Sequence, residues 1–221
     1  AGAQATANSL AEWMSLLWLT PAQDRLFVES AGARRRFLDR LVLAMDPAHA
    51  GHVSRYEAAM RARTRLLSED APADPQWLAA LERHMADHGV AVAQARRTLV
   101  EALAQHWQNR PSGDFPRAQL RLAQDEMVSA DDLALALAKS RTRDAAAGRA
   151  TLGPHRVDLE VMHLEKGQMA ALCSTGEQKA LLIGLILAHG GLVAKKIGKK
   201  PLFLLDEVAA HLDARRREAL F

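Results

Sequence analysis

The sequence lacks several features that would assign it to common classes of protein. It has a single cysteine, Cys173, so no disulfide can form within the chain, which fits a reducing cytosol. Its longest apolar run, about 180–193, is broken by glycines and a histidine and is too short to span a bilayer. No signal-peptide pattern opens the chain. We therefore expect a cytoplasmic protein with no membrane partner.

Neither sign of charge dominates the 221 residues. Lys and Arg number 29 against 26 Asp and Glu, which gives a formal net charge of +3. This balance is compatible with nucleic-acid binding but does not demand it. Hydrophobic residues make up 49% and charged residues 25%, as in a soluble globular protein rather than a disordered one. The length suits one or two domains with a substantial core.

The sequence also lacks Gly-x-x-x-x-Gly-Lys-Ser/Thr, the loop that cradles nucleotide phosphates. It does contain Ser174-Thr175-Gly176-Glu177-Gln178-Lys179, followed by an apolar run of helix formers. Free N–H groups and the positive end of the helix dipole would form an anion site there. Gly176 would let a phosphate approach the backbone, and an anion would rationalise Lys179 in the first turn. Taken alone, the segment is more simply a helix cap.

A second segment ends in two acids. Leu202, Phe203, Leu204 and Leu205 form an apolar run that predicts a fully buried parallel strand. Asp206 and Glu207 follow, at the strand end where open α/β sheets place ligands. One carboxylate there can hold Mg²⁺ through water, and its neighbour can orient or deprotonate an attacking water. The alternative is a buried strand that ends in two solvated acids.

The order and spacing of these segments resemble an ABC-type ATPase. Glu207 is followed after four residues by Leu212-Asp213, as a Walker B strand is followed by a D-loop, and the segment from Ser174 is similar to a signature motif. Two further segments, 153–159 (Gly-Pro-His-Arg-Val-Asp-Leu) and 34–39 (Arg-Arg-Arg-Phe-Leu-Asp), resemble the RecF family of recombinational DNA-repair ATPases. The resemblance covers most of the chain.

The resemblance implies an α/β fold: part of an ABC-type ATPase head, a P-loop NTPase fold, with an inserted, mainly α-helical arm or lobe. Residues 1–29 would be a remnant of the N-terminal half of the head, 30–148 the helical insertion, and 149–221 the C-terminal half of the head. Because the phosphate loop is absent and no Met opens the chain, we expect an internal fragment of a longer ATPase. The fragment alone should not hydrolyse ATP.

The resemblance also implies a mechanism in which two heads sandwich ATP. The signature of one protomer would face the γ-phosphate bound by the other, and the D-loop 211–213 would cross the dimer interface. Asp206 would serve Mg²⁺, Glu207 would be the general base, and Gln23 would stand at the Q-loop position. The residues expected to bind the nucleotide are Ser174, Thr175, Gly176, Glu177, Gln178 and Asp213.

By the same resemblance the parent protein would be a slow DNA-dependent ATPase of replication and repair. It would bind DNA at single-strand gaps and junctions of single and double strands as an ATP-dependent homodimer. With RecO and RecR it would load recombinase, in recombinational repair and the SOS response. Two alternatives stay open: a non-catalytic DNA-binding or scaffolding arm of an SMC-like protein, and the ATPase subunit of a transporter.

The region between these segments has helical periodicity. Apolar spacing predicts helices at 34–45 and 48–69, and the second should pack antiparallel against a long helix with a heptad stripe. That stripe consists of Leu78, Leu81, Met85, His88, Val92, Ala95, Leu99, Ala102 and His106. Alternation predicts strands at 118–122 and 157–161. Ser129 or Asp131 should cap a further helix.

Two basic clusters have open interpretations. Arginines at 34, 35, 36 and 40 oppose the dipole of their helix, so either they form a solvated face or an acidic partner, DNA or a carboxylate of the head balances them. Lysines at 195, 196, 199 and 200 precede the apolar strand. They form either a solvated loop or a contact to DNA, and the solvated loop is the simpler interpretation.

Overall fold

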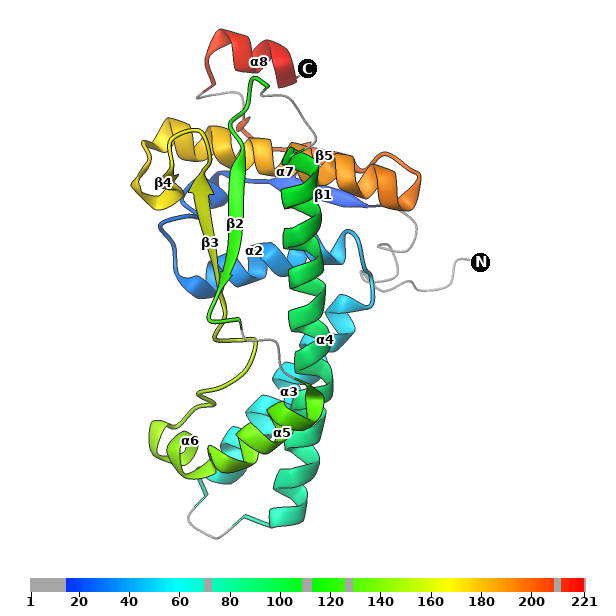
Figure 1. Ribbon diagram of the computed structural model, residues 1–221, viewed down its shortest axis with the longest axis vertical. Coiled ribbons are helices and arrows are strands. Elements are labelled where there is room, and N and C mark those ends of the chain that lie inside the picture. The colour runs from blue at the N-terminus through cyan, green and yellow to red at the C-terminus, as the bar shows by residue number, and fades with distance from the viewer. Residues whose placement is uncertain (1–14, 70–72, 109–112, 126–128, 209–211, 221) are drawn as a thin grey trace. The chain divides into compact units, whose positions relative to one another are not determined.

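The computed structural model describes residues 15–69, 73–108, 113–125, 129–208 and 212–220 (Figure 1). The chain divides into two compact units. The first, here called the sheet unit, comprises Ala1–Pro47, Thr98–Ala123 and Asp158–Phe221, and the second, the helical unit, comprises Ala48–Arg97 and Gln124–Val157. These units have bounds of their own. The assignment of 1–29 and 149–221 to an ATPase head, and of 30–148 to an insertion, stays a prediction.

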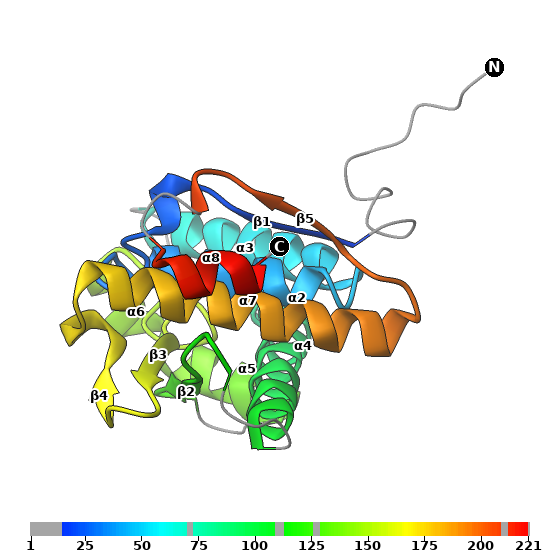
Figure 2. The same ribbon diagram turned by 90° about the horizontal axis from the view of Figure 1, so that it is seen from above.

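The sheet unit contains two small sheets with a long helix between them. Strands β1 (Leu16–Leu19) and β5 (Leu202–Leu205) pair in parallel, whereas β2 (Ala118–Ala123), β3 (Asp158–His163) and β4 (Gln168–Met169) form an antiparallel sheet. Helix α7 (Thr175–Ile197) lies between the two sheets, as Figure 2 shows from above. The strands predicted at 118–122 and 157–161 are confirmed.

The remaining elements of the sheet unit are short helices and turns. They are α2 (Ala31–Leu43), α8 (Ala214–Leu220) and the 3-10 turns η1 (Pro21–Gln23) and η2 (Ala170–Leu172), together with the last part of α4 (Pro75–Gln108), from Thr98 on. Helix α2 confirms the helix predicted at 34–45. It buries Phe37, Leu38, Leu41 and Val42, the apolar stripe that predicted it.

Helix α7 supplies much of the core of the sheet unit. Residues 180–186 are all buried, because apolar side chains surround the helix rather than forming one stripe. By length and composition alone the helix would suffice to cross a membrane, which corrects the expectation that its apolar run is too short. However, 61% of the apolar window is buried inside the structure, as in the core helix of a soluble protein.

Strand β5 is confirmed as a parallel strand, but the prediction that it is fully buried is wrong. Leu202 is 49% exposed and Leu204 50% exposed. Phe203, on the other face, packs on Gly190 of α7, where an added Cβ would overlap its ring. An apolar run predicts burial on both faces only if both faces are covered, and the described part of the chain covers one.

In the part of the helical unit that the structure describes there are four helices. They are α3 (His49–Leu67), the N-terminal part of α4 (Pro75–Gln108), α5 (Ala130–Lys139) and α6 (Arg141–Ala147). Helices α3 and α4 run antiparallel, as predicted, because Arg63 contacts Glu82 whereas the earlier His52 contacts the later His88. Ser129 caps α5, accepting a hydrogen bond from the Asp132 amide at 3.0 Å.

Helix α4 confirms the single long helix, but half of the predicted stripe is displaced by one residue. Leu78, Met85, Val92 and Leu99 are buried as expected, whereas the intervening buried positions are Glu82, Gly89, Arg96 and Leu103. The predicted residues at those turns, Leu81, His88, Ala95 and Ala102, are only half-buried, and so is His106, which precedes the buried Trp107. A search for apolar residue types misses this seam, because two of its members are charged side chains buried with partners.

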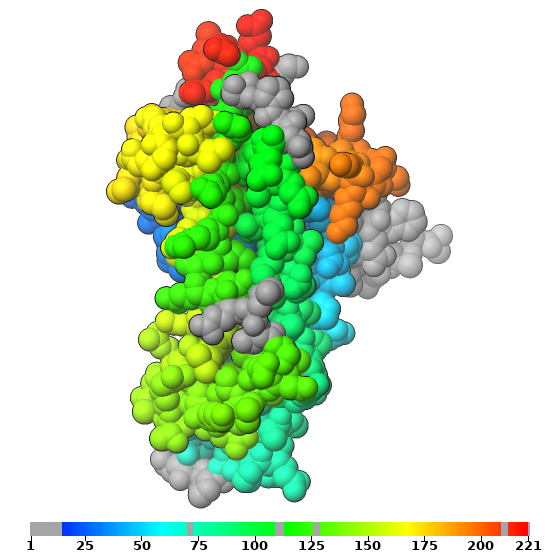
Figure 3. All heavy atoms as spheres, in the orientation of Figure 1, coloured from blue at the N-terminus to red at the C-terminus, as the bar shows by residue number. Residues whose placement is uncertain are grey.

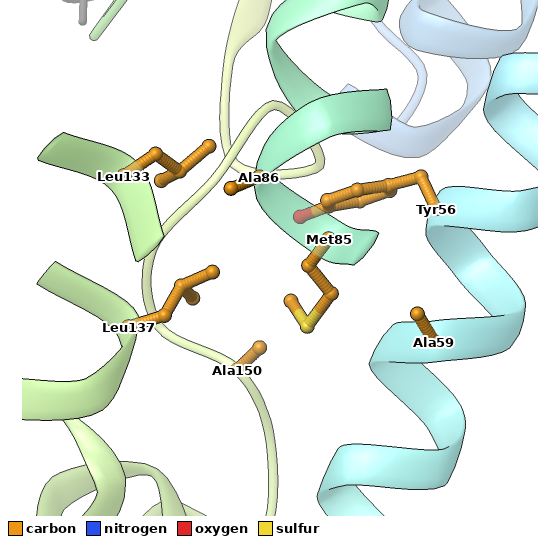
Figure 4. Packing of buried hydrophobic residues seen from close by; sticks show 7 residues of the cluster. All are labelled: Tyr56, Ala59, Met85, Ala86, Leu133, Leu137 and Ala150. Carbon is orange, nitrogen blue, oxygen red and sulfur yellow. The ribbon is translucent and has the colours of Figure 1, made fainter. Parts of the chain in front are cut away.

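The apolar core of the helical unit joins α3, α4 and α5. Tyr56 and Ala59 of α3 face Met85 and Ala86 of α4, and Leu133, Leu137 and Ala150 complete the cluster (Figure 4). Met85, Ala86 and Leu137 have no exposed surface. Burial of this set provides the hydrophobic stabilisation that holds the helices of this unit together.

Candidate nucleotide site

The start of α7 is fixed by a capping box. Ser174 is the N-cap residue, and its backbone N–H donates to Glu177 Oε2 at 2.9 Å. The carboxylate of Glu177 also pairs with Lys166. These contacts, Lys166 first, lower the pKa of Glu177 to about 2. Glu177 therefore carries its charge at neutral pH, and its carboxylate is committed to the helix start rather than free for a ligand.

The other predicted signature residues divide into two groups. Ser174, Thr175 and Gly176 are exposed, and an added Cβ on Gly176 would meet no atom within 4 Å. Gln178 is buried, and its side-chain amide donates to Cys173 O at 2.8 Å. The first three thus present an open helix start with a partial positive charge, which suits an anion. Gln178 instead holds the loop before the helix.

The predicted acids lie at the carboxyl end of β5. The Asp206 backbone N–H donates to Leu19 O at 3.0 Å, so the pairing of β1 and β5 continues to the strand tip. The chain then turns at Glu207, whose φ of 52° is in the left-handed region that non-glycine residues seldom adopt. Both residues are exposed. The geometry confirms their position at the strand tip, and their roles stay predictions.

Lys179 connects the helix start to the strand tip. Its side chain is buried, and its ammonium donates to Asp24 Oδ2 at 3.0 Å and to the backbone oxygen of Glu207 at 3.1 Å. The anion that the sequence required near Lys179 is therefore a carboxylate of the same chain. Asp24 was not among the predicted site residues, since a single acid after a Pro-containing turn carries no signal of its own.

Gln23 and Asp24 come from the turn that follows β1. Parallel strands end at the same edge of their sheet, so this turn and Asp206 share that edge. The side-chain oxygen of Gln23 accepts from the Thr20 backbone N–H at 3.1 Å, which closes its own turn. The role of Gln23 as a Q-loop glutamine stays a prediction.

Asp213 lies at the start of α8. Its carboxylate accepts from the Arg216 backbone N–H at 2.8 Å and pairs with the Arg216 guanidinium at 3.1 Å. Its side chain is 55% exposed, which leaves surface for a partner. His211, the first residue of the predicted D-loop, lies outside the described residues.

The predicted metal residue is a single carboxylate. Within the described residues no group of three or more His, Cys, Asp or Glu is placed to hold a metal ion. This donor set does not suit a tightly caged metal, but it fits Mg²⁺, which keeps several waters and is usually held by one or two carboxylates plus phosphate oxygens. Asp206, exposed at the strand tip, is such a carboxylate.

The two segments that carry the family resemblance meet in an ion pair. Arg34 donates through Nε to Asp158 Oδ1 at 2.9 Å and through Nη2 to Oδ2 at 2.6 Å. This bidentate pair lowers the pKa of Asp158. Arg40 lies 4.3 Å from the ring centroid of Trp18, and burial lowers the pKa of Arg40 to about 10. The sequence left open what balances the charge of Arg34. The structure shows that its acidic partner is Asp158, a carboxylate of the same unit.

The Gly-Pro-His-Arg segment is held in the helical unit. His155 Nδ1 lies 2.6 Å from the Tyr56 hydroxyl, and Arg96 donates to Pro154 O at 2.7 Å. Gly153 has a φ of 124°, and a Cβ there would overlap the Tyr56 hydroxyl, so only glycine fits. Arg156 stays exposed beside a cavity of about 350 Å³ between α4, α5 and this segment.

The lysine cluster is exposed at the end of α7. Lys195, Lys196, Lys199 and Lys200 lie on the surface, in the orange segment of Figure 3. The structure gives no ion pair between these lysines and any other described residue. Whether they contact DNA stays open.

Comparisons with known proteins agree on one family. No family model matches the chain. The DNA replication and repair protein RecF of Rhizobium etli (strain CIAT 652) is 52% identical over 225 residues, which cover 98% of this chain and 60% of that protein. The protein of the same name from Mesorhizobium japonicum is 50% identical over 226 residues, with 98% and 59% covered. The chain spans about 60% of the length of the curated relatives it matches.

Solved structures show the same fold. A structure of the recombination mediator protein RecF with ATP in the RecFOR pathway matches with a TM-score of 0.76 at 20% identity, over 94% of this chain and 58% of that one. A second structure of that mediator matches with a TM-score of 0.74, also at 20% identity. The fold is therefore that of part of an ABC-type ATPase head with a helical lobe, as predicted.

Proposed function

The chain belongs to the RecF family, and on that premise we propose that the protein carrying it is an ATP-dependent DNA-binding protein of replication and repair. The observation that supports this most is the cluster around Lys179. It brings the open start of α7, the acids after β5 and the turn after β1 together. Those three segments are the ones that the ABC-type resemblance assigns to nucleotide chemistry.

The helix start would act on a nucleotide bound by a second copy. Ser174, Thr175 and Gly176 present backbone N–H groups and the positive end of α7, which suit the γ-phosphate of ATP. Glu177 and Gln178 contribute by fixing the cap and the preceding loop. Asp213 would lie at the interface between the two copies. The active form is thus an ATP-dependent homodimer.

The strand tip would act on the nucleotide bound by its own protomer. Asp206 would hold Mg²⁺, largely through water, and the ion would neutralise phosphate charge. Glu207 would accept a proton from the attacking water or orient it. The chain turns at Glu207, and the two adjacent carboxylates would each serve one task.

We assign the regions of the chain accordingly. Residues 1–29 and 149–221 would belong to the ATPase head, and 30–148 to an inserted lobe. Because the sequence has no phosphate loop, this stretch alone should not hydrolyse ATP, whereas the full-length protein should be a slow DNA-dependent ATPase. The proposed site of action is the cytoplasm, without a membrane partner.

DNA is the proposed macromolecular ligand. The matched structures are of a mediator in the RecFOR pathway, which supports RecO and RecR as partners. Single-strand gaps or junctions are the proposed DNA sites. With these partners the full-length protein would load recombinase onto DNA in recombinational repair and the SOS response. Because phosphate contacts release counterions, DNA binding by the full-length protein should weaken steeply as salt rises.

The test uses the full-length protein with substitutions at the two halves of the site. Ser174→Arg should abolish ATP-dependent dimerisation in sedimentation, because a bulky cation occupies the helix start. Ser174→Asp keeps a capping side chain and repels phosphate, so it separates loss of the cap from loss of the site. Ser54→Arg, at an exposed position of α3, is the matched control.

Glu207→Gln should lower ATP turnover by at least about 100-fold and leave ATP-dependent dimerisation intact. Glu101→Gln, at an exposed position of α4, should change neither. Unchanged dimerisation of both Ser174 variants would contradict the role of the helix start. A wild-type protein that binds DNA without binding ATP would instead favour the scaffolding arm.

A further inference from the structure

Lys179 is buried and makes polar contacts that neither helix capping nor core packing requires. Its side chain is 5% exposed, although a lysine ammonium is costly to bury without partners. The two acceptors that the structure gives it come from separate segments: the carboxylate of Asp24 after β1, and the backbone oxygen of Glu207 after β5. The ammonium therefore ties α7 to the carboxyl ends of both strands.

Lys179 lies on the same rigid element as the helix start. The sequence predicted Lys179 in the first turn of α7, but it lies in the second, five residues after the N-cap Ser174, which at 1.5 Å per residue places it about 7.5 Å along the axis. The capping box fixes the first turn, and the following residues are buried in the core. A shift of the helix start on meeting a ligand would therefore shift the base of Lys179 as well.

The acceptor at the strand tip belongs to Glu207, whose backbone conformation needs stabilising contacts. Glu207 adopts a left-handed backbone, which a non-glycine residue holds only when its surroundings impose it. The hydrogen bond from Lys179 fixes the peptide that follows Glu207, and so the direction in which its side chain leaves the strand tip. Lys179 thus acts on Glu207 through the backbone and not through its carboxylate.

We propose that Lys179 is a positioning residue that couples the two nucleotide sites of the dimer. In each protomer, the start of α7 meets the nucleotide bound by the partner. Lys179 of the same helix holds Glu207, which serves the nucleotide bound by its own protomer. Engagement of one site thereby orients the general base of the other. This inference rests on the proposed function, in which the start of α7 and Glu207 of one protomer serve different nucleotides.

Homodimers of the full-length variant give the first readout. Lys179→Gln should lower kcat for ATP at least tenfold, leave KM within about twofold and preserve ATP-dependent dimerisation. Lys179→Arg, whose cation can reach both acceptors, should recover most of the turnover. Asp24→Asn removes the ion pair but leaves the bond to Glu207 O, so it should lower kcat less than Lys179→Gln does.

Mixed dimers separate positioning from a structural role. A protomer with Glu207 intact is mixed with a tenfold excess of a Glu207→Gln partner, so that nearly every active site lies in a mixed dimer. Lys179→Gln is then placed either in the protomer that carries the active Glu207 or in the inactive partner, which supplies its α7 start to that same site. We expect the tenfold loss only in the first arrangement.

The outcomes are distinct. Equal loss in both arrangements, or loss only when the substitution is in the inactive partner, would show that Lys179 merely supports α7 and would overturn the proposal. No loss in either arrangement would overturn it too. Failure of the proposed function looks different: wild-type protein would not dimerise with ATP, or Glu207→Gln homodimers would retain full turnover.

Discussion

The two units hold their buried cations in different ways. In the helical unit, Arg63 is fully buried and donates to Glu82 at 3.0 Å, to Asp144 at 2.7 Å and to Leu137 O at 2.7 Å. In the sheet unit, the acids beside Lys179 reach the surface: Asp24 is 33% exposed and Glu207 is exposed.

The difference separates a closed structural network from one that reaches the proposed site. Every charge in the Arg63 cluster has buried partners, and Asp144 also accepts hydrogen bonds from Ser140 and from Thr151, so the cluster fixes the packing of the helices and offers nothing to a ligand. The Lys179 cluster ends at an open strand tip.

The largest effect should come from breaking the closed network. Arg63→Met leaves Asp144 buried without a cation and Glu82 paired with Arg141 alone, so it should lower the free energy of unfolding by about 3–5 kcal/mol. The measurement is chemical denaturation of the chain followed by circular dichroism. Arg61→Met, at an exposed position of the same helix, is the control and should change it by less than about 0.5 kcal/mol. A loss below about 1 kcal/mol for Arg63→Met would show that the network contributes little.

A buried histidine of the sheet unit gives the next effect. Burial lowers the pKa of His189 to about 4, so the folded protein keeps it neutral while the unfolded chain binds a proton below about 6.5. Stability from this residue is complete above pH 6.5 and falls as pH drops toward 4, by up to about 1.4 kcal/mol per pH unit.

The check is a series of denaturation curves between pH 7.5 and 4.5. His189→Leu should flatten the acid loss, whereas His84→Gln, at an exposed position of α4, should leave the slope as it is. An unchanged slope for His189→Leu would mean that carboxylates of the chain cause the acid sensitivity instead. Because the proposed site does not include His189, the flattened slope should leave nucleotide chemistry of the full-length protein unchanged.

A smaller effect tests how tightly α7 lies on β5. Gly190→Ala would place a methyl group in the ring of Phe203 and should destabilise the chain by about 1–3 kcal/mol. Phe203→Leu in the same chain should recover part of the loss, as a double-mutant cycle would show. Gly113→Ala, where nothing lies within 4 Å of the added Cβ, is the control. If the stability losses of Gly190→Ala and Phe203→Leu were additive, the two residues would not be in contact.

Local patterns were enough to predict the elements that carry the proposed site. The helix at Ser174, the strand that ends at Asp206 and the bidentate pair partners Arg34 and Asp158 all lie in short segments with recognisable residue order. Helix capping and strand alternation act over a few residues, so sequence reports them well. The ABC-type order of the segments then predicted the fold that the structural matches show.

Contacts between distant segments could not be predicted from the sequence. Nothing in the sequence near Lys179 indicates that Asp24 will neutralise it, and nothing near Arg63 indicates that it will be buried. The exposure of Leu202 and Leu204 depends on what covers a sheet face, not on the residues of the strand. The sequence did not indicate that Gln178 and Glu177 would make hydrogen bonds to their own chain, and their contact with a nucleotide stays a prediction.

Cross-linking tests the central claim most directly. Ser174→Cys in full-length protein that also carries Cys173→Ala is treated with an ATP analogue bearing a thiol-reactive group on its γ-phosphate. If the start of α7 meets the nucleotide of a second copy, labelling should rise with protein concentration and disappear below the concentration at which dimers form. Labelling at the same rate in dilute monomer, or none at any concentration, would contradict the account.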